Sequence, residues 1–416
     1  MDASNDHPAD GGALSGLRVL DLSRVLAGPW SSQLLGDFGA DVVKVERPGS
    51  GDDTRAWGPP WLKDEEGRDT SDAAYYLCAN RNKRSVTVDL GSSAGQALVR
   101  ELAAKADVLV ENFKVGGLQA YGLDYESLKA INPRLIYCSV TGFGQTGPYA
   151  PRPGYDFLVQ GMGGLMSLTG QPDGMPGGGP LKVGVALTDV MTGLYATVAI
   201  LAALAFRERT GLGQHIDLAL LDVQVAALAN QASNYLVGGQ VPRRMGNAHP
   251  NIVPYQDFRT ADGHMIVTVG NDTQFASFCR VLGHPHWATD ERFATNAARV
   301  QQRTELVGLI DAVTRTRTTQ TWIALMESAG VPCGPIDTLD KVFANPQVVA
   351  RGMKVEMDHS VAGTVPLVGN PIRMSASPVQ YRRAPPTVGQ HTPEVLQGWL
   401  EMGESEVDRL RGLGVL

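Results

Sequence analysis

The chain has 416 residues, and at roughly 100–200 residues per domain this length allows two to four domains. Hydrophobic residues make up 43% of the chain, which is enough for large buried cores and excludes bulk disorder. With 36 basic and 43 acidic residues the net charge is −7, which argues against nucleic-acid or membrane partners, because basic patches supply affinity for both. Glycine is in excess, at 48 of 416 residues against a usual share of about 7%.

Four cysteines are far apart in the sequence and form neither a CxxC pair nor a zinc-finger pattern: Cys78, Cys138, Cys279 and Cys333. We therefore expect buried, unpaired thiols, a cytoplasmic protein and no metal site. Residues 1–13 are polar and lack an apolar stretch, so we expect disorder there and no targeting signal. The most apolar run, Val190–Phe206, is shorter than a comfortable membrane span of about 20 residues and is expected to be a buried helix.

The first 150 residues alternate between strand-like and helix-like segments. Strands are expected at Leu17–Leu22, Asp41–Glu46, Ser85–Leu90, Asp107–Glu111 and Leu135–Val140. Helices are expected after Gly28-Pro29, after Ser93, where Ser-x-x-Gln has the form of a capping box, and at Tyr125–Ile131. Strands that alternate with helices predict an α/β fold with a parallel sheet, and ligands on such sheets bind at the carboxyl ends of the strands.

The glycine excess is concentrated in the next segment, where eight of the 19 residues from 161 to 179 are glycine. A strand at Lys182–Leu187 and a long helix from about Asp189 are expected after it. Val237–Pro250 has the Gly/Arg/Pro-rich composition of a linker. Strands at Tyr255–Arg259 and His264–Val269, with helices between about 273 and 330, then indicate a second, smaller α+β domain.

Gly142–Gly147 match the pattern Gly-x-Gly-x-x-Gly after a strand, which is typical of a dinucleotide site. The context excludes that site, because Pro148, Pro151 and Pro153 follow at once and prevent the helix that the motif must open. A tight loop that brings bare backbone close to a ligand, or a plain turn, remains. The sequence contains neither a P-loop nor a Gly-x-Ser-x-Gly elbow, so it supports neither ATP binding nor a serine hydrolase.

Asp189 lies at the expected strand-to-helix junction, directly after the glycine-rich segment. A carboxylate in that place is stabilised as an anion by the free N–H groups and the dipole of the helix N-terminus. Two roles fit, a helix cap or an ionised nucleophile. Gly177, Gly178 and Gly179 have no side chains that would block a bulky electrophile, and their backbone N–H groups could stabilise an oxyanion beside such a nucleophile.

Five arginines cluster in the N-terminal part of the chain: Arg24, Arg47, Arg55, Arg81 and Arg84. In an acidic protein, basic residues near strand ends suit phosphates or carboxylates. Solvated surface charge is the alternative for each of them.

Eight segments spread along the chain carry a resemblance to a known family: LRVLDLSRVLAGPWSSQLLGDFGADVVKVERPGSGDDTR (17–55), NRNKRSVTVDL (80–90), ADVLVENFKVGGLQAYGL (106–123), IYCSVTGFGQTGPYAPRPGYD (136–156), TDVMTGLYATVAILAAL (188–204), GNAHPNIVPYQ (246–256), VPCGPI (331–336) and GQHTPEVL (389–396). They resemble family III CoA-transferases, the CaiB/BaiF family that includes formyl-CoA transferases. The resemblance is strongest to its succinyl-CoA:glutarate (hydroxymethylglutarate) group and covers nearly the whole chain past residue 14.

That resemblance implies a ring-shaped subunit, in which a Rossmann-like large domain joins a smaller α+β domain through two linkers. It also implies a homodimer of two interlocked rings. On this basis the large CoA-binding domain spans residues 14–230, the first linker 231–250 and the small domain 251–335. Residues 336–416 then supply a return linker and a C-terminal part that packs on the large domain.

In this family the covalent nucleophile is an aspartate that opens a D-x-x-T/S-G element, here Asp189–Gly193. The resemblance implies that Asp189 carries CoA as an aspartyl-CoA thioester from an acyl-CoA donor, expected to be succinyl-CoA, to a dicarboxylic acid such as glutarate or itaconate. Exchange of one thioester for another requires no ATP, metal or permanently bound cofactor, so coenzyme A enters as acyl-CoA substrate. Arg24, Arg55 and Arg84 are candidates to bind the second carboxylate of the acceptor.

Contacts to CoA are expected, by motif match, from the strand ends of the large domain: Arg24, Arg47, Val88, Asp89, Asn112, Phe113, Lys114, Gly142, Gly144, Gln145 and Tyr155. Arg47 would bind the nucleotide phosphates, Val88-Asp89 would lie near the adenine, and the Gly142–Gln145 loop would follow the pantetheine arm. Some relatives have arginine where this chain has Ala120, which makes Lys114 a further candidate for the phosphates.

Three alternatives remain on the same resemblance. A 2-methylacyl-CoA racemase uses a histidine–aspartate pair, but Tyr155 stands at the histidine position, and a phenol with a pKa near 10 is a poor proton shuttle at neutral pH. A formyl-CoA:oxalate-like transferase is disfavoured because Arg24 and Leu26 stand where such relatives often have His and Gln. A non-catalytic CoA-binding scaffold is disfavoured because the Asp189 element is retained.

Overall fold

The computed structural model describes residues 11–416, which form two compact units. The first unit contains the described chain up to Gly164 together with Val183–Ala232 and Gln347–Leu416, and the second contains Leu165–Lys182 and Ser233–Pro346. Most of the segment expected to be disordered, residues 1–13, lies outside the described residues. The domain boundaries drawn from the sequence stay predictions.

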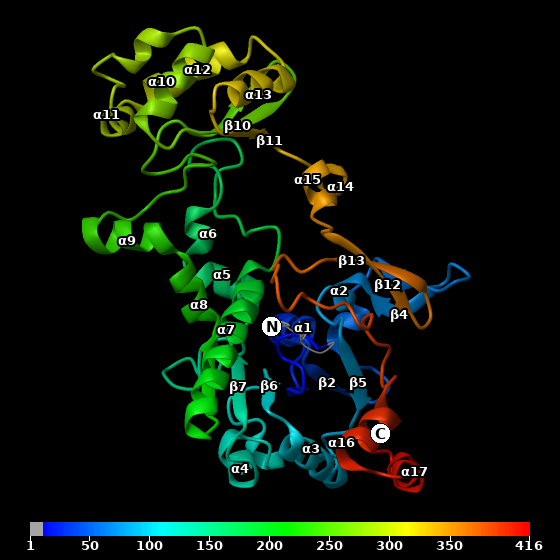
Figure 1. Cartoon of the computed structure of the whole chain (residues 1–416). Helices are drawn as coiled ribbons and strands as arrows, with labels where there is room; N and C mark the ends of the chain where they lie inside the picture. Colours follow the sequence, from blue (N-terminus) through cyan, green and yellow to red (C-terminus); the bar gives the residue numbers. More distant parts are fainter. Residues whose placement is uncertain (1–10) are drawn as a thin grey trace, which may run out of the picture. The chain divides into compact units, whose positions relative to one another are not determined.

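Six parallel strands form the centre of the first unit, which confirms the predicted α/β fold (Figure 1). In sheet order they are β5 (Lys83–Thr87), β2 (Asp41–Glu46), β1 (Arg18–Asp21), β6 (Val108–Glu111), β7 (Ile136–Thr141) and β8 (His215–Ala219). The chain adds β2 and β5 on one side of β1 and then β6 to β8 on the other, so the strand order reverses between β1 and β6. A crevice beyond the carboxyl ends of the strands at such a switch point is the usual ligand site of an open α/β sheet.

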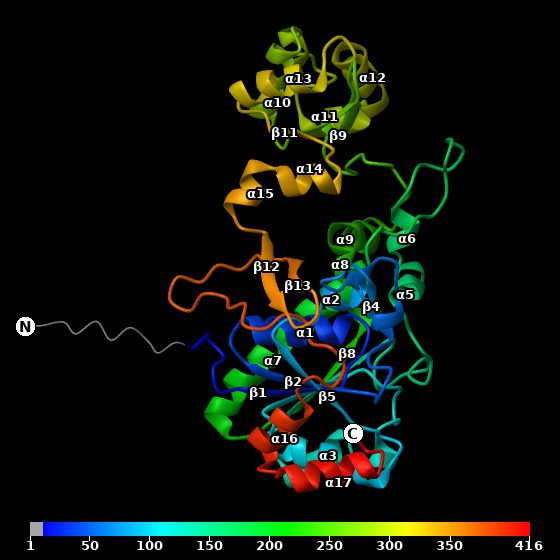
Figure 2. The ribbon, with the colours of Figure 1, turned by 90° about the vertical axis from the view of Figure 1, so that its right-hand side faces the viewer.

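Both faces of this sheet are apolar, as expected for a parallel sheet covered by helices on both sides. Along β6, Val108 and Val110 face one layer and Leu109 faces the other. Helices α1 (Ala27–Asp37), α5 (Asp156–Met162), α7 (Leu187–Thr210) and α8 (Leu220–Ala227) contribute to the core on the first face. Helices α3 (Ser93–Lys105), α4 (Tyr125–Ile131), α16 (Thr392–Leu400) and α17 (Glu404–Gly412) cover the second, where α3, α16 and α17 lie side by side (Figure 2).

Several smaller elements of the first unit were not predicted from the sequence. They are the antiparallel pair β3 (Trp61–Lys63) and β4 (Asp69–Ala73), helix α2 (Ala74–Leu77), and the antiparallel pair β12 (Lys354–His359) and β13 (Gly363–Val368). Helix α15 (Pro346–Ala350) precedes β12. Tyr76 of α2 packs with Met357 of β12 and Val365 of β13 in a separate small core.

The second unit has its own core around an antiparallel sheet of three strands, in the order β11 (Cys333–Pro335), β10 (His264–Thr268) and β9 (Tyr255–Arg259). Its helices are α6 (Leu165–Leu168), α10 (Asp272–Val281), α11 (Asn296–Gln301), α12 (Arg303–Thr314), α13 (Thr319–Ser328) and α14 (Leu339–Ala344). Phe258, Met265, Phe278 and Trp322 are buried together between the sheet and these helices.

Three local predictions were wrong. Lys182–Leu187 is not a strand, since the backbone N–H of Val183 donates to the side chain of Gln160 and not to a neighbouring strand. The cap of α3 is Ser92, whose hydroxyl accepts from the N–H of Gly95, and not Ser93. Helix α9 (Ala229–Gly238) overlaps the start of the expected linker, whose bounds stay a prediction. All four cysteines are free as expected, but Cys78 is exposed.

Helix α7 is the one helix among residues 11–416 that is long and apolar enough to cross a membrane by length and composition. Its Ala196, Ile200 and Ala203 are buried in the core beside α1 and β7. One side of α7 therefore packs as in a core helix, but the prediction of a buried helix was only partly right, because other apolar side chains along α7, such as Val198, are exposed.

Candidate active site

A pocket lies beyond the carboxyl ends of β1, β6 and β7 in the first unit. The loops after these strands supply most of its wall, and Asp189 at the start of α7 lies in it. A second pocket adjoins it, because Arg24 and Phe113 line both. The two pockets therefore occupy the switch point between β1 and β6, where the strand order predicts a ligand.

Asp189 occupies the first turn of α7 and is 8% exposed. Burial, reinforced by the nearby charge of Asp156, raises its pKa to about 7 from an ordinary value of 3.8. Asp156 in turn accepts a hydrogen bond from the backbone N–H of Asp189 at 3.2 Å, and from the Gln160 side chain at 2.6 Å. Asp189 is therefore a poorly solvated carboxylate with little local stabilisation of its charge, which makes it more reactive toward an electrophile than one in water.

The residues that follow Asp189 explain why α7 begins at this point. The Thr192 hydroxyl donates to the Thr188 carbonyl at 2.7 Å, and the Thr188 hydroxyl donates to Gln224 at 2.7 Å. A Cβ on Gly193 would lie 2.7 Å from the carbonyl oxygen of Ala27, so only glycine lets α7 approach the start of α1 this closely. The Asp-x-x-Thr-Gly element therefore holds the N-termini of two helices together at the pocket.

Two glycines close the loop that follows β7. A Cβ on Gly142 would lie 2.5 Å from the Cα of Gly154, and a Cβ on Gly154 would lie 2.4 Å from the Cα of Gly142. This backbone contact brings Tyr155 and Asp156 back to the end of β7 beside the pocket. Within the part of the chain that the structure describes, Gly142, Gly154 and Tyr155 line this pocket, whereas Gly144 lines neither of the two.

The loop after β1 is held by hydrogen bonds from the side chains of Asn112 and Asp52. Asn112 accepts from the backbone N–H of Arg24 at 2.9 Å and donates to its carbonyl at 2.7 Å. Asp52 accepts from the N–H of Val25, which has φ of 72°. Because a β-branched residue rarely adopts positive φ, this conformation persists only where the surroundings enforce it, and such strain is found mostly at functional sites.

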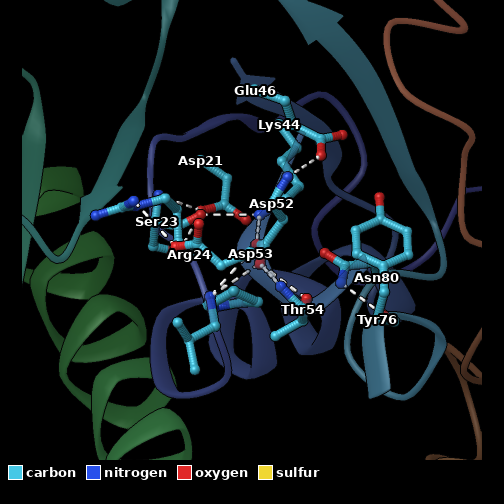
Figure 3. Close-up of polar contacts among 12 residues, drawn as sticks. Asp21, Ser23, Arg24, Lys44, Glu46, Asp52, Asp53, Thr54, Tyr76 and Asn80 are labelled. Atoms are coloured by element: carbon cyan, nitrogen blue, oxygen red, sulfur yellow. Dashed lines mark hydrogen bonds and ion pairs between the residues drawn. The ribbon is translucent and has the colours of Figure 1, made fainter. Parts of the chain in front are cut away.

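A buried network of charges supports that loop from below (Figure 3). Lys44 is fully buried, forms an ion pair with Asp52 at 2.8 Å and donates to the Ser23 carbonyl at 2.8 Å. Lys83 pairs with Asp21 at 3.0 Å, and neighbouring lysines lower the pKa of Asp21 to about 2 against the effect of burial. These pairs fix the Ser23–Val25 backbone at the point where the two pockets meet.

The second pocket contains the residues that the sequence assigns to the nucleotide end of CoA. Arg47, Val88 and Asp89 line it, together with Lys44 and Gly51. Arg24 lies between both pockets with its guanidinium 5.7 Å from the centre of the Phe113 ring, and it pairs with Asp53 at 3.1 Å. The structure thus brings together Asp189 and these predicted CoA contacts: Arg24, Arg47, Val88, Asp89, Asn112, Phe113, Lys114, Gly142 and Tyr155.

Other predicted site residues lie elsewhere. Gln145 lines a third pocket, and its backbone N–H donates to Asp217 at 3.0 Å. Gly177–Gly179 belong to the second unit, so their role opposite Asp189 stays a prediction.

Arg55 and Arg84 do not have the free donors that an acceptor carboxylate needs. Arg55 is 2% exposed and donates to Glu46 and Asp72, over the ring of Tyr76. Arg84 donates to Asp41 and to Glu394. Both arginines hold the fold together, since their partners come from distant parts of the chain.

Two further residues contact Asp189 or line its pocket without having been predicted as site residues. Asp156, which hydrogen-bonds Asp189, directly follows Tyr155 in the quoted Gly-Tyr-Asp motif, so the motif carried a signal for it. Arg152 lines the pocket from the proline-rich loop before that motif, where no local pattern marked it as a ligand. Residues 11–416 contain no group of three or more His, Cys, Asp or Glu side chains that could hold a metal ion.

The first unit is thus a doubly wound α/β fold with a buried carboxylate at its switch point, where such sheets bind their ligands. Comparison with known proteins identifies the family. The chain belongs to CoA-transferase family III, whose family model matches residues 14–392, and it is therefore a CoA-transferase.

Two named relatives and one solved structure illustrate the match. The chain is 54% identical over 383 residues to succinate–glutarate CoA-transferase of Agrobacterium fabrum, covering 92% of this chain and 94% of that protein. It is 45% identical over 403 residues to succinyl-CoA:glutarate CoA-transferase of mouse, covering 97% and 90%. A crystal structure of a CaiB/BaiF family protein from Brucella suis has 52% identity and a TM-score of 0.82, over 94% of this chain and all of that one.

Proposed function

We propose that this CoA-transferase moves CoA from succinyl-CoA to a dicarboxylic acid, with glutarate as the first candidate and itaconate as a second. The observation that carries the proposal is the buried carboxyl of Asp189 in a pocket that adjoins a second one, lined by Arg47, Val88 and Asp89. The names of the Agrobacterium and mouse relatives support the choice of succinate and glutarate.

Asp189 acts as the nucleophile in four balanced steps. Its carboxylate oxygen attacks the thioester carbonyl of the donor, and the C–S bond breaks to give a mixed anhydride and CoA thiolate. The thiolate attacks the aspartyl carbonyl, and the donor acid leaves as a carboxylate with the formation of aspartyl-CoA. The acceptor carboxylate then attacks this thioester, and the released thiolate attacks the acyl carbonyl of the new anhydride. Asp189 is regenerated as a carboxylate without net proton transfer.

Local electrostatics support this role in two ways. The raised pKa of Asp189 reflects a carboxylate that loses solvation in the pocket, and its conversion to a neutral anhydride or thioester removes that unfavourable charge. Leu26 and Ala27 at the N-terminus of α1 line the same pocket. The free backbone N–H groups and the dipole of a helix N-terminus favour negative charge, so α1 suits the oxyanion of each tetrahedral intermediate.

CoA would extend from the nucleotide pocket of Arg47, Val88 and Asp89, past Arg24 and Phe113, to Asp189. Lys114 is available for a phosphate or for the substrate. In this proposal the backbone N–H groups of Gly177–Gly179 approach the reacting carbonyl, since glycine has no side chain in the way. CoA enters and leaves as a substrate and is not a resident cofactor.

The proposed partner is a second copy of the chain, in the interlocked ring arrangement that the family resemblance implies. Helix α7 supports a protein partner, because large apolar side chains along it are exposed: Leu194, Tyr195, Val198, Leu201 and Phe206. Val198 is 63% exposed, and an apolar stripe of this kind is typical of an interface. We place the enzyme in the cytoplasm.

An acceptor panel tests the proposal. The enzyme is mixed with succinyl-CoA and glutarate, itaconate, oxalate or acetate, and the acyl-CoA products are identified by mass spectrometry. Glutaryl-CoA formed together with an equal amount of succinate is the expected result, and Asp189→Ala is the matched control. Formation of oxalyl-CoA with no glutaryl-CoA would refute the proposed acceptor, and the absence of any new acyl-CoA would refute CoA transfer by Asp189.

A further inference from the structure

Three cationic side chains line the pocket that contains Asp189: Arg24, Lys114 and Arg152. Arg24 lies at the border with the nucleotide pocket and is already paired with Asp53. Arg152 lines the Asp189 pocket but not the nucleotide pocket. Across residues 11–416, no carboxylate lies within ion-pair distance of the Arg152 guanidinium. Its charge is therefore available to a ligand at the acyl end of the site.

The guanidinium of Arg152 is oriented by two aromatic rings. Its central carbon lies 4.6 Å from the ring centre of Tyr149 and 5.4 Å from that of Phe143. These two rings pack edge to face at 5.7 Å, and Phe143 is buried. The backbone N–H of Arg152 also donates to the Tyr149 carbonyl at 2.9 Å. A stacked guanidinium keeps its in-plane N–H donors free, so Arg152 is preorganised for a planar anion.

We infer that Arg152 binds the far carboxylate of the dicarboxylic acyl group and so determines specificity for diacids. The inference rests on the proposed function. A diacid that reacts at Asp189 brings a second negative charge into a pocket that already holds the carboxylates of Asp189 and Asp53. This charge needs a cationic partner, and the guanidinium fork binds a carboxylate through two parallel hydrogen bonds. A monocarboxylic acid leaves Arg152 unpaired and is therefore a poorer acceptor.

A competition assay separates this role from a general role in CoA binding. Wild type and Arg152→Gln are given succinyl-CoA with equal concentrations of glutarate and pentanoate, which has the same chain length but one carboxylate. The ratio of glutaryl-CoA to pentanoyl-CoA is measured by mass spectrometry at early times. Both acceptors draw on the same aspartyl-CoA, so the ratio is independent of how fast the donor reacts. Arg152→Lys tests whether charge without the fork restores part of the selectivity.

We expect the ratio to fall about 10- to 100-fold in Arg152→Gln, because a hydrogen bond to a charged group contributes about 1.5–3 kcal/mol. The matched control is Arg280→Gln, because Arg280 is an exposed arginine on α10 that lines neither pocket, and it is expected to keep the wild-type ratio. If the wild type prefers glutarate but the ratio is unchanged in Arg152→Gln, the proposed role of Arg152 is overturned and the proposed diacid acceptor is not. A wild type that prefers pentanoate overturns both this inference and the proposed diacid acceptor.

Discussion

Replacing the nucleophile by its neutral isostere, Asp189→Asn, should stabilise the protein above pH 7. Burial raises the pKa of Asp189 from 3.8 to about 7. Between these values the folded protein keeps a proton that the unfolded chain has lost, so stability falls as the pH rises through this window. At 1.36 kcal/mol per pH unit, the full difference corresponds to about 4 kcal/mol once the pH exceeds the pKa of the folded state. The open pocket admits water, so about 2–4 kcal/mol is expected.

Thermal unfolding of wild type and Asp189→Asn at pH 4.5 and pH 8.5 measures this effect. The Tm of the variant should exceed that of wild type by roughly 2–5 °C at pH 8.5 and by much less at pH 4.5. Asp358→Asn is the matched control, because Asp358 is exposed on β12 and its charge stays in water in both states. A Tm difference that is equal at the two pH values, or a variant that is less stable than wild type at pH 8.5, would refute the assignment of Asp189 as a destabilised anion.

Four further changes probe the site. In the wild type, kcat/KM for succinyl-CoA should rise with pH, reach half of its maximum near pH 7 and level off above it, following the ionisation of Asp189; a flat profile between pH 5 and 8 contradicts this. Arg24→Met should raise the KM for succinyl-CoA about tenfold in initial-rate assays whatever the acceptor, since Arg24 lines both pockets; an unchanged KM removes it from the CoA site. Gly154→Ala should lower transferase activity more than about tenfold while the circular dichroism spectrum is retained, because the new Cβ would lie 2.4 Å from the Cα of Gly142. Gly184→Ala is the control and should keep its activity, because there is open space around Gly184. Asp52→Asn should lower the free energy of unfolding in urea by about 3 kcal/mol because it leaves Lys44 buried and unpaired; a loss below about 1 kcal/mol would show that the network is dispensable.

The sheet was predictable because its strands are short apolar runs that alternate with amphipathic helices, and β2 and α4 match their predicted bounds. The predicted strand at Lys182–Leu187 does not form, because an apolar pattern does not show whether a neighbouring strand is present to pair with it. In the structure the side chain of Gln160 occupies that hydrogen-bonding position, and Val185 is exposed. The β3–β4 pair was not predicted because the sequence of β4, Asp69–Ala73, is polar and has low strand propensity.

The residues of the candidate site were predictable where a sequence motif marked them. They were not predictable where ion pairs with distant residues determine whether a side chain is free to bind a ligand. Asp189 and the strand-end residues Arg24 and Asn112 lie together because the switch-point topology brings the loops of β1 and β6 to one edge. Arg55 and Arg84 looked equally suitable in sequence, but Asp72 and Glu394 neutralise them in the fold. Pairing of this kind depends on contacts between segments up to 310 residues apart, which local sequence does not report.

Trapping of the covalent intermediate tests whether Asp189 is the nucleophile. The enzyme is incubated with succinyl-CoA without an acceptor, treated with hydroxylamine, digested and analysed by peptide mass spectrometry. A hydroxamate at Asp189 that forms only when succinyl-CoA is present is the predicted result. A hydroxamate at another carboxylate near the pocket, such as Asp53 or Asp156, or an active enzyme in which Asp189 stays unmodified, would contradict the role of Asp189 as nucleophile.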